Sequence, residues 1–331
     1  MHCFKYGTRK PLPETPKICT QVYYYPRRKG FSPTLPYIVF SRKNEELHRR
    51  LLEDDAPVLL EGIHCSWPVL DKRFSRKKMA VRLFNIEFDY YKGLAKYTRS
   101  WLKKWYYRSE SRLLRKYEAK IAKNAVVLAL SASDSSYYQQ IFGAQNTHFL
   151  PVMFYGSAEI LPGTGDYCLY HGNLSVEENE EAALGLIRNV FPGLGIPLVI
   201  AGKNPSAQLI RAVNNLPGAS VIANPTELKM NQLVSCAQIN VLPALNSTGV
   251  KLKILYALFH GRHCITNTAG VTGLPQTGLI SVAETAESLK KWITEHYPVP
   301  FTQEMIQERT RLLKQHFDAG KQAEQLMSYL Y

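Results

Sequence analysis

The chain has 331 residues, of which 45% are hydrophobic and 11% aromatic, so it is long enough for two globular domains and too apolar for a disordered protein. No apolar run approaches the roughly 18–20 residues that a membrane-spanning helix needs, and the first residues show no apolar stretch typical of a signal peptide. Six scattered cysteines without a C-x-x-C pair indicate reduced thiols. From these features we expect a cytoplasmic protein, since nothing in the sequence directs export or predicts a membrane-spanning helix.

Positive charge is concentrated in the first part of the chain. Residues 1–150 hold 28 Lys and Arg against 13 Asp and Glu, whereas residues 151–331 hold 13 against 14, which gives the net charge of +14. The two parts therefore face different partners, and an anionic surface attracts the first.

Short apolar runs and helical patterns alternate through residues 1–150. The pattern predicts strands at 2–6, 21–25, 57–60, 79–84, 126–130 and 148–150, a short apolar segment at 36–40, and helices at 44–52, 86–123 and 133–141. Ser133 and Asp134 are the expected N-cap of the last of these helices.

Polar side chains follow the third and fourth predicted strands. Glu61 and His64 come after the third, where His64 is placed as a proton shuttle or an acceptor-binding group, although a single His is more often structural. Arg82, Asn85 and Glu87 flank the end of the fourth strand. The carboxyl ends of neighbouring parallel strands meet at one edge, so we expect these side chains to line the same cleft.

Residues 97–123 alternate aromatic side chains with Lys and Arg. The aromatic residues are Trp101, Trp105, Tyr106, Tyr107 and Tyr117. A basic helix with interfacial aromatic residues suits an anionic membrane surface. Nucleic acid is a rival partner, and a solvated face over an aromatic core stripe would need no partner. We favour the inner face of the cell membrane and expect no nucleic acid partner.

The best candidate for a linker is the segment 151–165, which contains two Pro and three Gly and coincides with the change in charge. It separates a predicted first domain at residues 1–150 from a second at 166–300. The segment 301–331 then holds two closing helices, predicted at 302–317 and 319–330.

Five short apolar runs alternate with helical patterns in the second domain. They lie at residues 167–171, 198–201, 219–223, 239–242 and 263–266. This alternation predicts a parallel sheet with helices on both faces. Ligands of such sheets bind outside the carboxyl ends of the strands, so the turns that follow the runs form the candidate site.

The first turn contains Gly172 and Asn173, followed by Ser175 as the expected helix N-cap and Glu178 at the capping-box position. A glycine lets the backbone approach a ligand, and a helix N-terminus binds phosphate. An ordinary strand-to-helix turn explains the same residues equally well.

The next two turns also carry polar residues. Gly202 and Lys203 end the second run, where the lysine would neutralise an anion or simply lie in solvent. Asn224 ends the third run, where it would contact a base or sugar or, as the alternative, form an Asx-Pro turn before the next helix.

The fourth turn is the strongest candidate. Thr248 and Gly249 open a helix with an apolar face, and Lys251 and Lys253 lie in its first turn. The helix dipole makes cations unfavourable there, which indicates an anion between them, unless the side chains extend away into solvent.

Residues 166–267 resemble the donor-binding half of a GT-B glycosyltransferase, in the large retaining family (group 1, or family 4-like) that builds bacterial polysaccharides. The resemblance is carried by Tyr170-His171-Gly172-Asn173-Leu174, Ile200-Ala201-Gly202-Lys203-Asn204-Pro205 and Thr248-Gly249-Val250-Lys251-Leu252-Lys253. In the first half, the matching segment is Asn85-Ile86-Glu87-Phe88-Asp89-Tyr90-Tyr91.

The resemblance implies an α/β fold of two Rossmann-like, doubly wound parallel-sheet domains that face each other across a cleft, with the C-terminal helices crossing back to the first domain. It implies transfer of a hexose, with retention, from a nucleotide diphosphate-sugar to a lipid-linked or surface-polysaccharide acceptor. No cofactor or metal is expected, since backbone N–H groups and cations stabilise the departing diphosphate.

Roles for individual residues follow from the same resemblance. The expected catalytic residues are His64, Lys203 and Lys253. The expected donor-binding residues are Gly172, Asn173, Gly202, Asn224, Thr248, Gly249 and Lys251. The expected acceptor-side residues are Glu61, Arg82, Asn85 and Glu87.

Three departures from the family pattern favour an alternative function. The two glutamates of the family fall at Thr248 and Tyr256, and a histidine of this branch falls at Phe84. The opening strand and Gly-rich turn of the family are not found, so the first domain is expected to be incomplete at its N-terminus. The alternative is a non-catalytic nucleotide-sugar-binding or scaffold protein.

Overall fold

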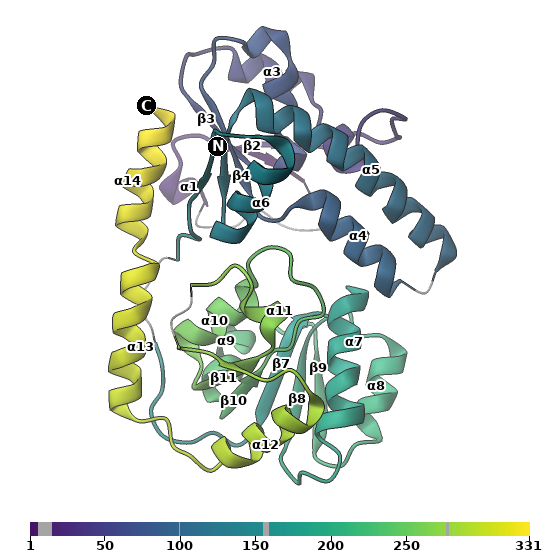
Figure 1. Cartoon of the computed structure of the whole chain (residues 1–331), viewed down its shortest axis with the longest axis vertical. Helices are drawn as coiled ribbons and strands as arrows, with labels where there is room; N and C mark the ends of the chain where they lie inside the picture. The colour runs from purple at the N-terminus through teal and green to yellow at the C-terminus, as the bar shows by residue number, and fades with distance from the viewer. Residues whose placement is uncertain (6–14, 99, 155–158, 276–277) are drawn as a thin grey trace. The chain divides into compact units, whose positions relative to one another are not determined.

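The computed structural model describes residues 1–5, 15–98, 100–154, 159–275 and 278–331 (Figure 1). The chain forms two compact units. The first unit comprises Met1–Lys92, Leu102–Leu150 and Glu324–Tyr331, and the second comprises Gly93–Trp101 and Pro151–Ala323. Four residues of the predicted linker, 155–158, and Tyr6 of the first predicted strand lie outside the described residues.

A six-stranded parallel sheet forms the centre of the second unit. Its strands run in the order β12-β11-β10-β7-β8-β9. Their bounds are β7 Cys168–Asn173, β8 Leu198–Lys203, β9 Ala219–Ala223, β10 Ile239–Val241, β11 His263–Thr266 and β12 Ser281–Val282. All five predicted strands of this region are confirmed, whereas the two-residue strand β12 was not predicted.

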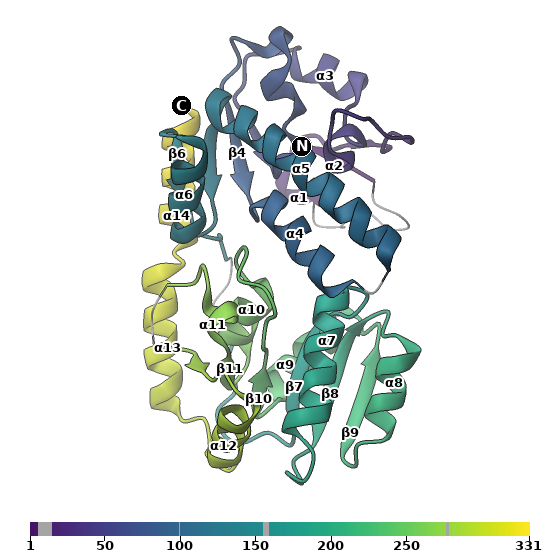
Figure 2. The same ribbon diagram turned by 45° about the vertical axis from the view of Figure 1, so that its right-hand side comes forward.

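Helices cover both faces of this sheet. In both ribbon views, α7 and α8 lie on one face and α9 and α10 on the other (Figures 1 and 2). The helices are α7 Glu177–Gly185, which continues as a π-helix at Leu186–Val190, α8 Ala207–Asn214, α9 Glu227–Cys236, α10 Leu252–His260, α11 Thr268–Val271, α12 Ala286–His296, α13 Gln303–His316 and α14 Ala319–Leu330. The sheet is therefore doubly wound, and its central strands are buried on both faces.

The first unit contains a four-stranded parallel sheet in the order β3-β4-β5-β6 and a separate parallel pair, β1-β2. The strands are β1 His2–Phe4, β2 Tyr23–Tyr25, β3 Val58–Glu61, β4 Met79–Leu83, β5 Val126–Ala129 and β6 Thr147–Phe149. The helices are α1 Thr15–Ile18, α2 Tyr37–Phe40, α3 Glu45–Leu51, α4 Glu87–Tyr97, α5 Trp101–Asn124 and α6 Ala132–Phe142, with 3₁₀ turns η1 Ile63–Cys65, η2 Trp67–Leu70 and η3 Lys72–Phe74.

Two helix predictions in this unit need correction. The region 86–123 is not one helix, because α4 ends at Tyr97 and α5 begins at Trp101. Helix α6 is capped by Ser131 rather than by Ser133 or Asp134: its backbone is extended and its Oγ accepts from the Asp134 N–H at 2.9 Å.

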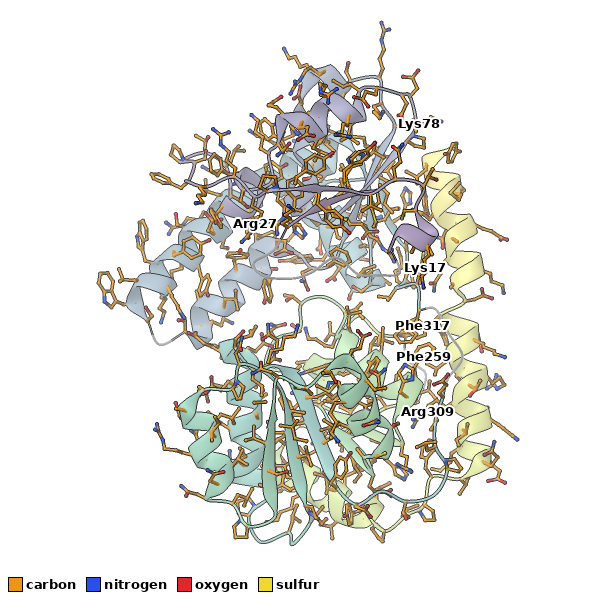
Figure 3. The ribbon with its side chains drawn as sticks, turned by 180° about the vertical axis from the view of Figure 1, so that it is seen from behind. Lys17, Arg27, Lys78, Phe259, Arg309 and Phe317 are labelled. Atoms are coloured by element: carbon orange, nitrogen blue, oxygen red, sulfur yellow. The ribbon has the colours of Figure 1, made fainter. Side chains whose placement is uncertain are left out.

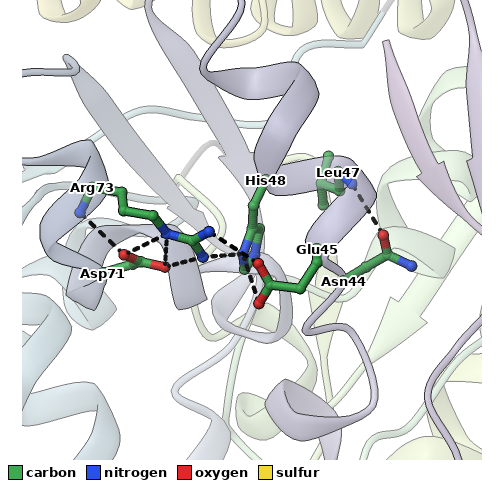
Figure 4. Close-up of polar contacts among 6 residues, drawn as sticks. All are labelled: Asn44, Glu45, Leu47, His48, Asp71 and Arg73. Atoms are coloured by element: carbon green, nitrogen blue, oxygen red, sulfur yellow. Dashed lines mark hydrogen bonds and ion pairs between the residues drawn. The ribbon is translucent and has the colours of Figure 1, made fainter.

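Helix α3 is held at its first turn by polar contacts (Figure 4). The Asn44 Oδ1 accepts from the Leu47 N–H at 3.0 Å and caps the helix. The Arg73 guanidinium bonds Asp71 at 2.6 Å and Glu45 at 3.0 Å, and it lies 3.3 Å from Nδ1 of the buried His48. These contacts hold the first turn of α3 against the 3₁₀ turn η3.

All six cysteines are unpaired, as predicted. Cys168 and Cys264 are buried, but Cys236 is exposed. Among the residues that the structure describes, no helix is both long and apolar enough to span a bilayer.

A buried arginine anchors α13 to the end of α10. The Arg309 Nη1 donates to the carbonyl oxygens of Gly261 at 2.8 Å and Arg262 at 2.6 Å. Burial lowers the pKa of Arg309 to about 10. Figure 3 shows Arg309 on α13 near Phe259 and Phe317, whose rings meet edge to face at 6.2 Å. Arg309 therefore joins the closing helix to the sheet of the second unit.

We expect Arg309→Leu to destabilise this region by about 2 kcal/mol, because it leaves two buried carbonyl groups without donors. Hydrogen exchange of the β10 and β11 amides would measure the loss. Arg311→Leu on the same helix is the control, since Arg311 is exposed and its ion pair with Glu308 contributes little. Equal exchange rates in the two variants would contradict the anchoring role.

Candidate functional site

The turn after β7 lies at the carboxyl edge of the second sheet. The Asn173 Oδ1 accepts from the Ser175 hydroxyl at 2.8 Å and from its N–H at 3.3 Å. The Asn179 Nδ2 in turn donates to the Asn173 carbonyl at 3.0 Å. Side chains of the turn and of α7 therefore hold the Gly172–Asn173 backbone in place.

The predicted capping box at this turn is wrong. Helix α7 begins at Glu177, and its N-cap Val176 provides no side-chain cap. Ser175 is engaged by Asn173 instead, and Glu178 turns away from the helix end to accept a hydrogen bond from the Asn246 amide. Glu178 is buried, so its carboxylate becomes part of the site rather than of the cap.

Asn246 organises the fourth turn. Its Oδ1 accepts from the Thr248 N–H and hydroxyl, both at 3.2 Å, and from the Lys251 Nζ at 2.9 Å. Gly249 follows with φ +65°, a conformation that favours glycine. The side chain of Lys251 is thus directed back onto the backbone of the turn, immediately before α10 begins.

Lys253 lies deepest in the site. Its Nζ donates to the Tyr170 hydroxyl at 3.3 Å and to the Asn179 Oδ1 at 3.2 Å, and it sits 4.7 Å from the centre of the Tyr170 ring. Asn179 therefore contacts both Lys253 and Asn173. This shared residue brings the first and fourth turns together, as predicted from the ends of parallel strands.

Burial lowers the pKa of Lys253 from 10.5 to about 8, and the nearby Lys251 lowers it further while Glu178 opposes the shift. Holding the charged form at neutral pH costs about 3 kcal/mol at 1.4 kcal/mol per pKa unit. Since the unfolded state binds the proton more tightly, this contribution makes stability rise as pH increases from about 8 to 10.5. Lys253 is therefore a half-buried cation whose direct hydrogen-bond acceptors are neutral and whose charge Glu178 offsets only in part.

Gly172 and Gly202 lie at the ends of the neighbouring strands β7 and β8, and packing requires a glycine at only one of them. A Cβ on Gly202 would lie 1.9 Å from the Gly172 carbonyl oxygen, so strand packing alone requires glycine there. A Cβ on Gly172 would meet nothing closer than Asn179, at 3.6 Å. Packing of the protein therefore does not require glycine at position 172.

Lys203 and Asn224 lie at the ends of β8 and β9. Lys203 is exposed and pairs in register with Asn173. The Asn224 Oδ1 accepts from the Asn204 N–H at 2.9 Å, and both asparagines have positive φ. The Asn224 amide is therefore engaged in a structural turn. This role is close to the Asx-Pro turn that the sequence left open as the alternative to ligand contact.

The two positions where the family places its glutamates carry other contacts. Thr248 bonds Asn246, as described above. The Tyr256 hydroxyl donates to the Asn231 side chain, and its ring packs on His260 at 4.6 Å. Neither position supplies a carboxylate, and the buried acid that the site does contain is Glu178.

In the first unit, Glu61 and Arg82 form an ion pair at the carboxyl ends of β3 and β4. The two residues pair in register, and the Arg82 Nη1 lies 3.7 Å from the Glu61 Oε1. Burial raises the pKa of Glu61, while Arg82 acts in the opposite direction.

His64 and Glu87 share the electrostatic influence of Arg42. Burial lowers the pKa of His64 to about 4, and Arg42 lowers it further. Burial raises the pKa of Glu87 to about 7, while Arg42 and the Asn85 amide oppose the rise. His64 is therefore neutral at pH 7, and Glu87 holds its proton more tightly than an ordinary carboxyl group.

The conformation of the turn that carries His64 depends on Gly62. Gly62 has φ +100°, and a Cβ there would lie 2.5 Å from the His64 ring. Of the five residues predicted for this edge, Glu61 pairs with Arg82 and Glu87 with Asn85, while His64 and Glu87 share Arg42, a cation that sequence reasoning missed.

Four residues of the second-unit site were also missed: Tyr170, Glu178, Asn179 and Asn246. All four stood inside the motifs that marked the site, but their side chains were not assigned to it. Within the described residues, no group of three or more His, Cys, Asp or Glu is close enough to hold a metal ion.

Comparison with known proteins identifies this arrangement. Residues 165–296 match the family model described as glycosyl transferases group 1. This segment, which holds the second sheet and the turns described above, is therefore similar to a group 1 glycosyltransferase domain. A Klebsiella pneumoniae protein described as an uncharacterized 44.6 kDa protein in cps region is 26% identical over 273 residues, which cover 78% of this chain and 70% of that protein. The cps region printed for that relative agrees with the polysaccharide type that the resemblance predicted.

Solved structures confirm the GT-B fold. TarM superposes with a TM-score of 0.65 at 8% identity over 86% of this chain, which spans only 57% of the TarM chain. Anabaena HepE in complex with UDP and glucose gives 0.64 at 12% identity, covering 93% of this chain and 85% of that one. Sucrose-phosphate synthase from Thermosynechococcus elongatus gives 0.64 at 14% identity, covering 89% and 76%.

The contrast between Gly172 and Gly202 is testable. Gly202→Ala should destabilise the second unit by about 3 kcal/mol or more, since the new Cβ meets backbone that cannot move freely. Gly172→Ala should melt near the wild-type temperature but weaken ligand binding. Thermal unfolding and ligand titration of both variants separate these effects, and equal loss of stability would show that Gly172 is structural.

Proposed function

We propose that this chain transfers a hexose, with retention, from a nucleotide diphosphate-sugar to a lipid-linked or surface-polysaccharide acceptor. The observation that carries the proposal is the half-buried Lys253 at the first turn of α10. A cation held at a cost of about 3 kcal/mol, beside two glycine turns and a helix N-terminus, suits an anionic ligand.

The donor diphosphate would bind at the carboxyl edge of the second sheet. Lys251 and Lys253 offset its charge, and the backbone at Gly172 and Gly249 approaches its oxygens. These groups stabilise the charge that develops on the leaving diphosphate without a metal ion. Lys203 is exposed on the adjacent strand, where it adds a long-range cation rather than a fixed contact. HepE, solved with UDP and glucose, supports a donor of this class.

The acceptor would be bound by the strand ends of the first unit. Because His64 is neutral at pH 7, its imidazole accepts a hydrogen bond from an acceptor hydroxyl or takes its proton. Glu61, Arg82 and Glu87 supply hydrogen bonds to further hydroxyls of a glycan. Asn85 holds the Glu87 carboxylate.

A membrane surface would bring the enzyme to a lipid-linked acceptor on the cytoplasmic side. The first turns of α5 expose Trp101 and Trp105, whose exposed fractions are 76% and 71%. Lys103 and Lys104 lie between them in the sequence. Aromatic side chains flanked by cations suit the interface of an anionic bilayer.

The second candidate function is nucleotide-sugar binding without transfer. It is favoured by Thr248 and Tyr256, whose side chains are engaged by Asn246 and Asn231 at the two positions of the family's glutamates. Both candidates require donor binding, so turnover distinguishes them. Binding without transfer or hydrolysis of any UDP- or GDP-sugar would favour the second.

Lys253→Met should weaken binding of UDP- or GDP-sugars at least tenfold, because a charge-assisted bond to the diphosphate is lost. The same change should raise stability at pH 7, since it removes a half-buried charge. Isothermal titration calorimetry and thermal unfolding measure the two effects. Lys229→Met, at an exposed lysine of α9, is the control. Unchanged donor affinity in Lys253→Met would refute the assignment.

Donor affinity should also depend on the protonation of Lys253. With its pKa at about 8, the amine loses its charge above that pH, so binding should be about tenfold weaker at pH 9 than at pH 7. Calorimetry across this range tests the expectation. The dependence should vanish in Lys253→Met, and a dependence that persists there would assign the titration to another group.

The protein should float with vesicles that contain about 30 mol% phosphatidylserine but not with neutral ones. The double change Trp101→Ser and Trp105→Ser should abolish flotation, whereas Tyr331→Ser, which removes an aromatic ring that is also exposed, should not. Equal flotation with neutral vesicles would contradict the electrostatic part. Binding to DNA or RNA with a steep salt dependence would favour nucleic acid instead.

A further inference from the structure

The first unit contains a cavity of about 460 Å³, of whose lining residues only Glu61 belongs to the proposed acceptor site. One wall consists of residues 1–4, which include β1, and the other of residues 56–61, which include β3. No residue of β2 or β4 lines it. The cavity therefore lies on the side of β1 away from β2 and on the side of β3 away from β4. We call it the β1–β3 groove.

The main chain of β1 presents hydrogen-bonding groups to this groove. Met1 and Lys5 bond β2, through Tyr23 N–H to Met1 O at 2.9 Å and Lys5 N–H to Tyr25 O at 2.8 Å. Because residues of a parallel strand bond alternately to either side, the N–H and C=O groups of His2 and Phe4 face away from β2.

The main chain of β3 does the same on the opposite wall. The Val58 N–H donates to the Lys78 carbonyl at 2.9 Å, so Val58 and Leu60 face β4. Leu59 and Glu61 therefore direct their N–H and C=O groups into the groove. In the described part of the chain, β1 and β3 belong to different sheets, and no main-chain hydrogen bond joins them.

The remaining lining makes the groove apolar inside and charged at its rim. Leu47 and Leu51 of α3 line it, and α3 is held firmly by the contacts that Figure 4 shows. Asp54 is exposed at the rim, and its Oδ1 accepts at 3.1 Å from the Nζ of Lys77, whose side chain is buried. An occupant must therefore be apolar along its length.

We propose that the β1–β3 groove binds one extended, apolar β-strand from a partner polypeptide. Two facing walls with free main-chain donors and acceptors need an occupant with donors and acceptors along both of its edges. A peptide backbone in the extended conformation has this pattern, whereas a lipid chain or a small apolar molecule does not. Adding the strand would join β1–β2 and β3–β6 into one sheet and remove two open edges.

The groove reaches the candidate acceptor site. Glu61 and Cys65 line it, and they flank the turn that carries His64. One end of a docked strand would therefore lie beside the groups proposed to bind the acceptor. The partner would complete this part of the first unit as well as stabilise it.

The test uses the full chain and a capped, fluorescent peptide with five Val and Ile residues between terminal lysines. Saturating peptide should slow amide exchange of Phe4, Leu59 and Glu61 at least tenfold. The same peptide with alternate amides N-methylated keeps its apolar side chains but loses donors, and it should not bind. Comparable binding of the methylated peptide, or protection confined to other segments, would overturn the proposal.

A pair of variants isolates the main-chain contact. Leu59→Pro removes one N–H that faces the groove and leaves the bonds to β4, whereas Leu59→Ala removes only the side chain. Leu59→Pro should bind the peptide about tenfold more weakly than Leu59→Ala, as expected for one lost hydrogen bond. Equal affinities would overturn the proposal, as would slow exchange of these amides without peptide, which would show that the chain fills the groove itself. Neither readout depends on sugar transfer. The strand-binding proposal can therefore fail while the proposed donor binding remains correct.

Discussion

The close approach of β7 and β8 at their carboxyl ends is the constraint on which the second unit depends. Gly202 leaves only enough room for the Gly172 carbonyl oxygen, so the two strands pair along their whole length until both chains turn. The turns therefore start side by side. Asn173, at the end of this pairing, is then held by Asn179, and Asn179 in turn holds Lys253. A packing restriction between two backbones thus sets the position of a cation on a helix that follows much later in the chain.

Lys253 illustrates a conflict between stability and binding. An amine with two neutral hydrogen-bond acceptors and an aromatic ring is well oriented, but these partners do not neutralise its charge. The protein is less stable at neutral pH than it would be with an apolar side chain there. An anionic ligand would reverse this balance, because it would add a countercharge beside the amine to the partial one of Glu178. The stability that the free protein loses by holding this charge is therefore regained when an anionic ligand binds.

Much of the fold could be predicted from the sequence because its parallel strands are apolar runs that end in Gly, Asn or Lys turns. The lysines of the fourth turn could also be predicted, since cations at a helix N-terminus contradict local electrostatics. The network around them could not. Asn246 and Asn179 carry no such signal, and their roles arise only when segments distant in sequence meet.

Predictions from local sequence preferences were wrong where tertiary contacts compete with those preferences. Ser175 and Glu178 match a capping box, yet Asn173 engages the serine and Asn246 the glutamate. In the same way, nothing in the local sequence marks Arg42 as the cation near His64 and Glu87. Patterns along the chain therefore located the site, and only the packed structure assigned its polar side chains.

The membership of residues 324–331 in the first unit has a consequence for biosynthesis. Tyr329 stacks on His148 at 4.7 Å, and Lys78 donates to the Tyr331 carbonyl at 2.9 Å. A ribosome delivers the chain from its N-terminus, so the first unit emerges early but lacks these contacts until residues 324–331 have been synthesised. The second unit, by contrast, has all its strands in one continuous stretch. The unit that is made first is therefore the one that finishes folding last.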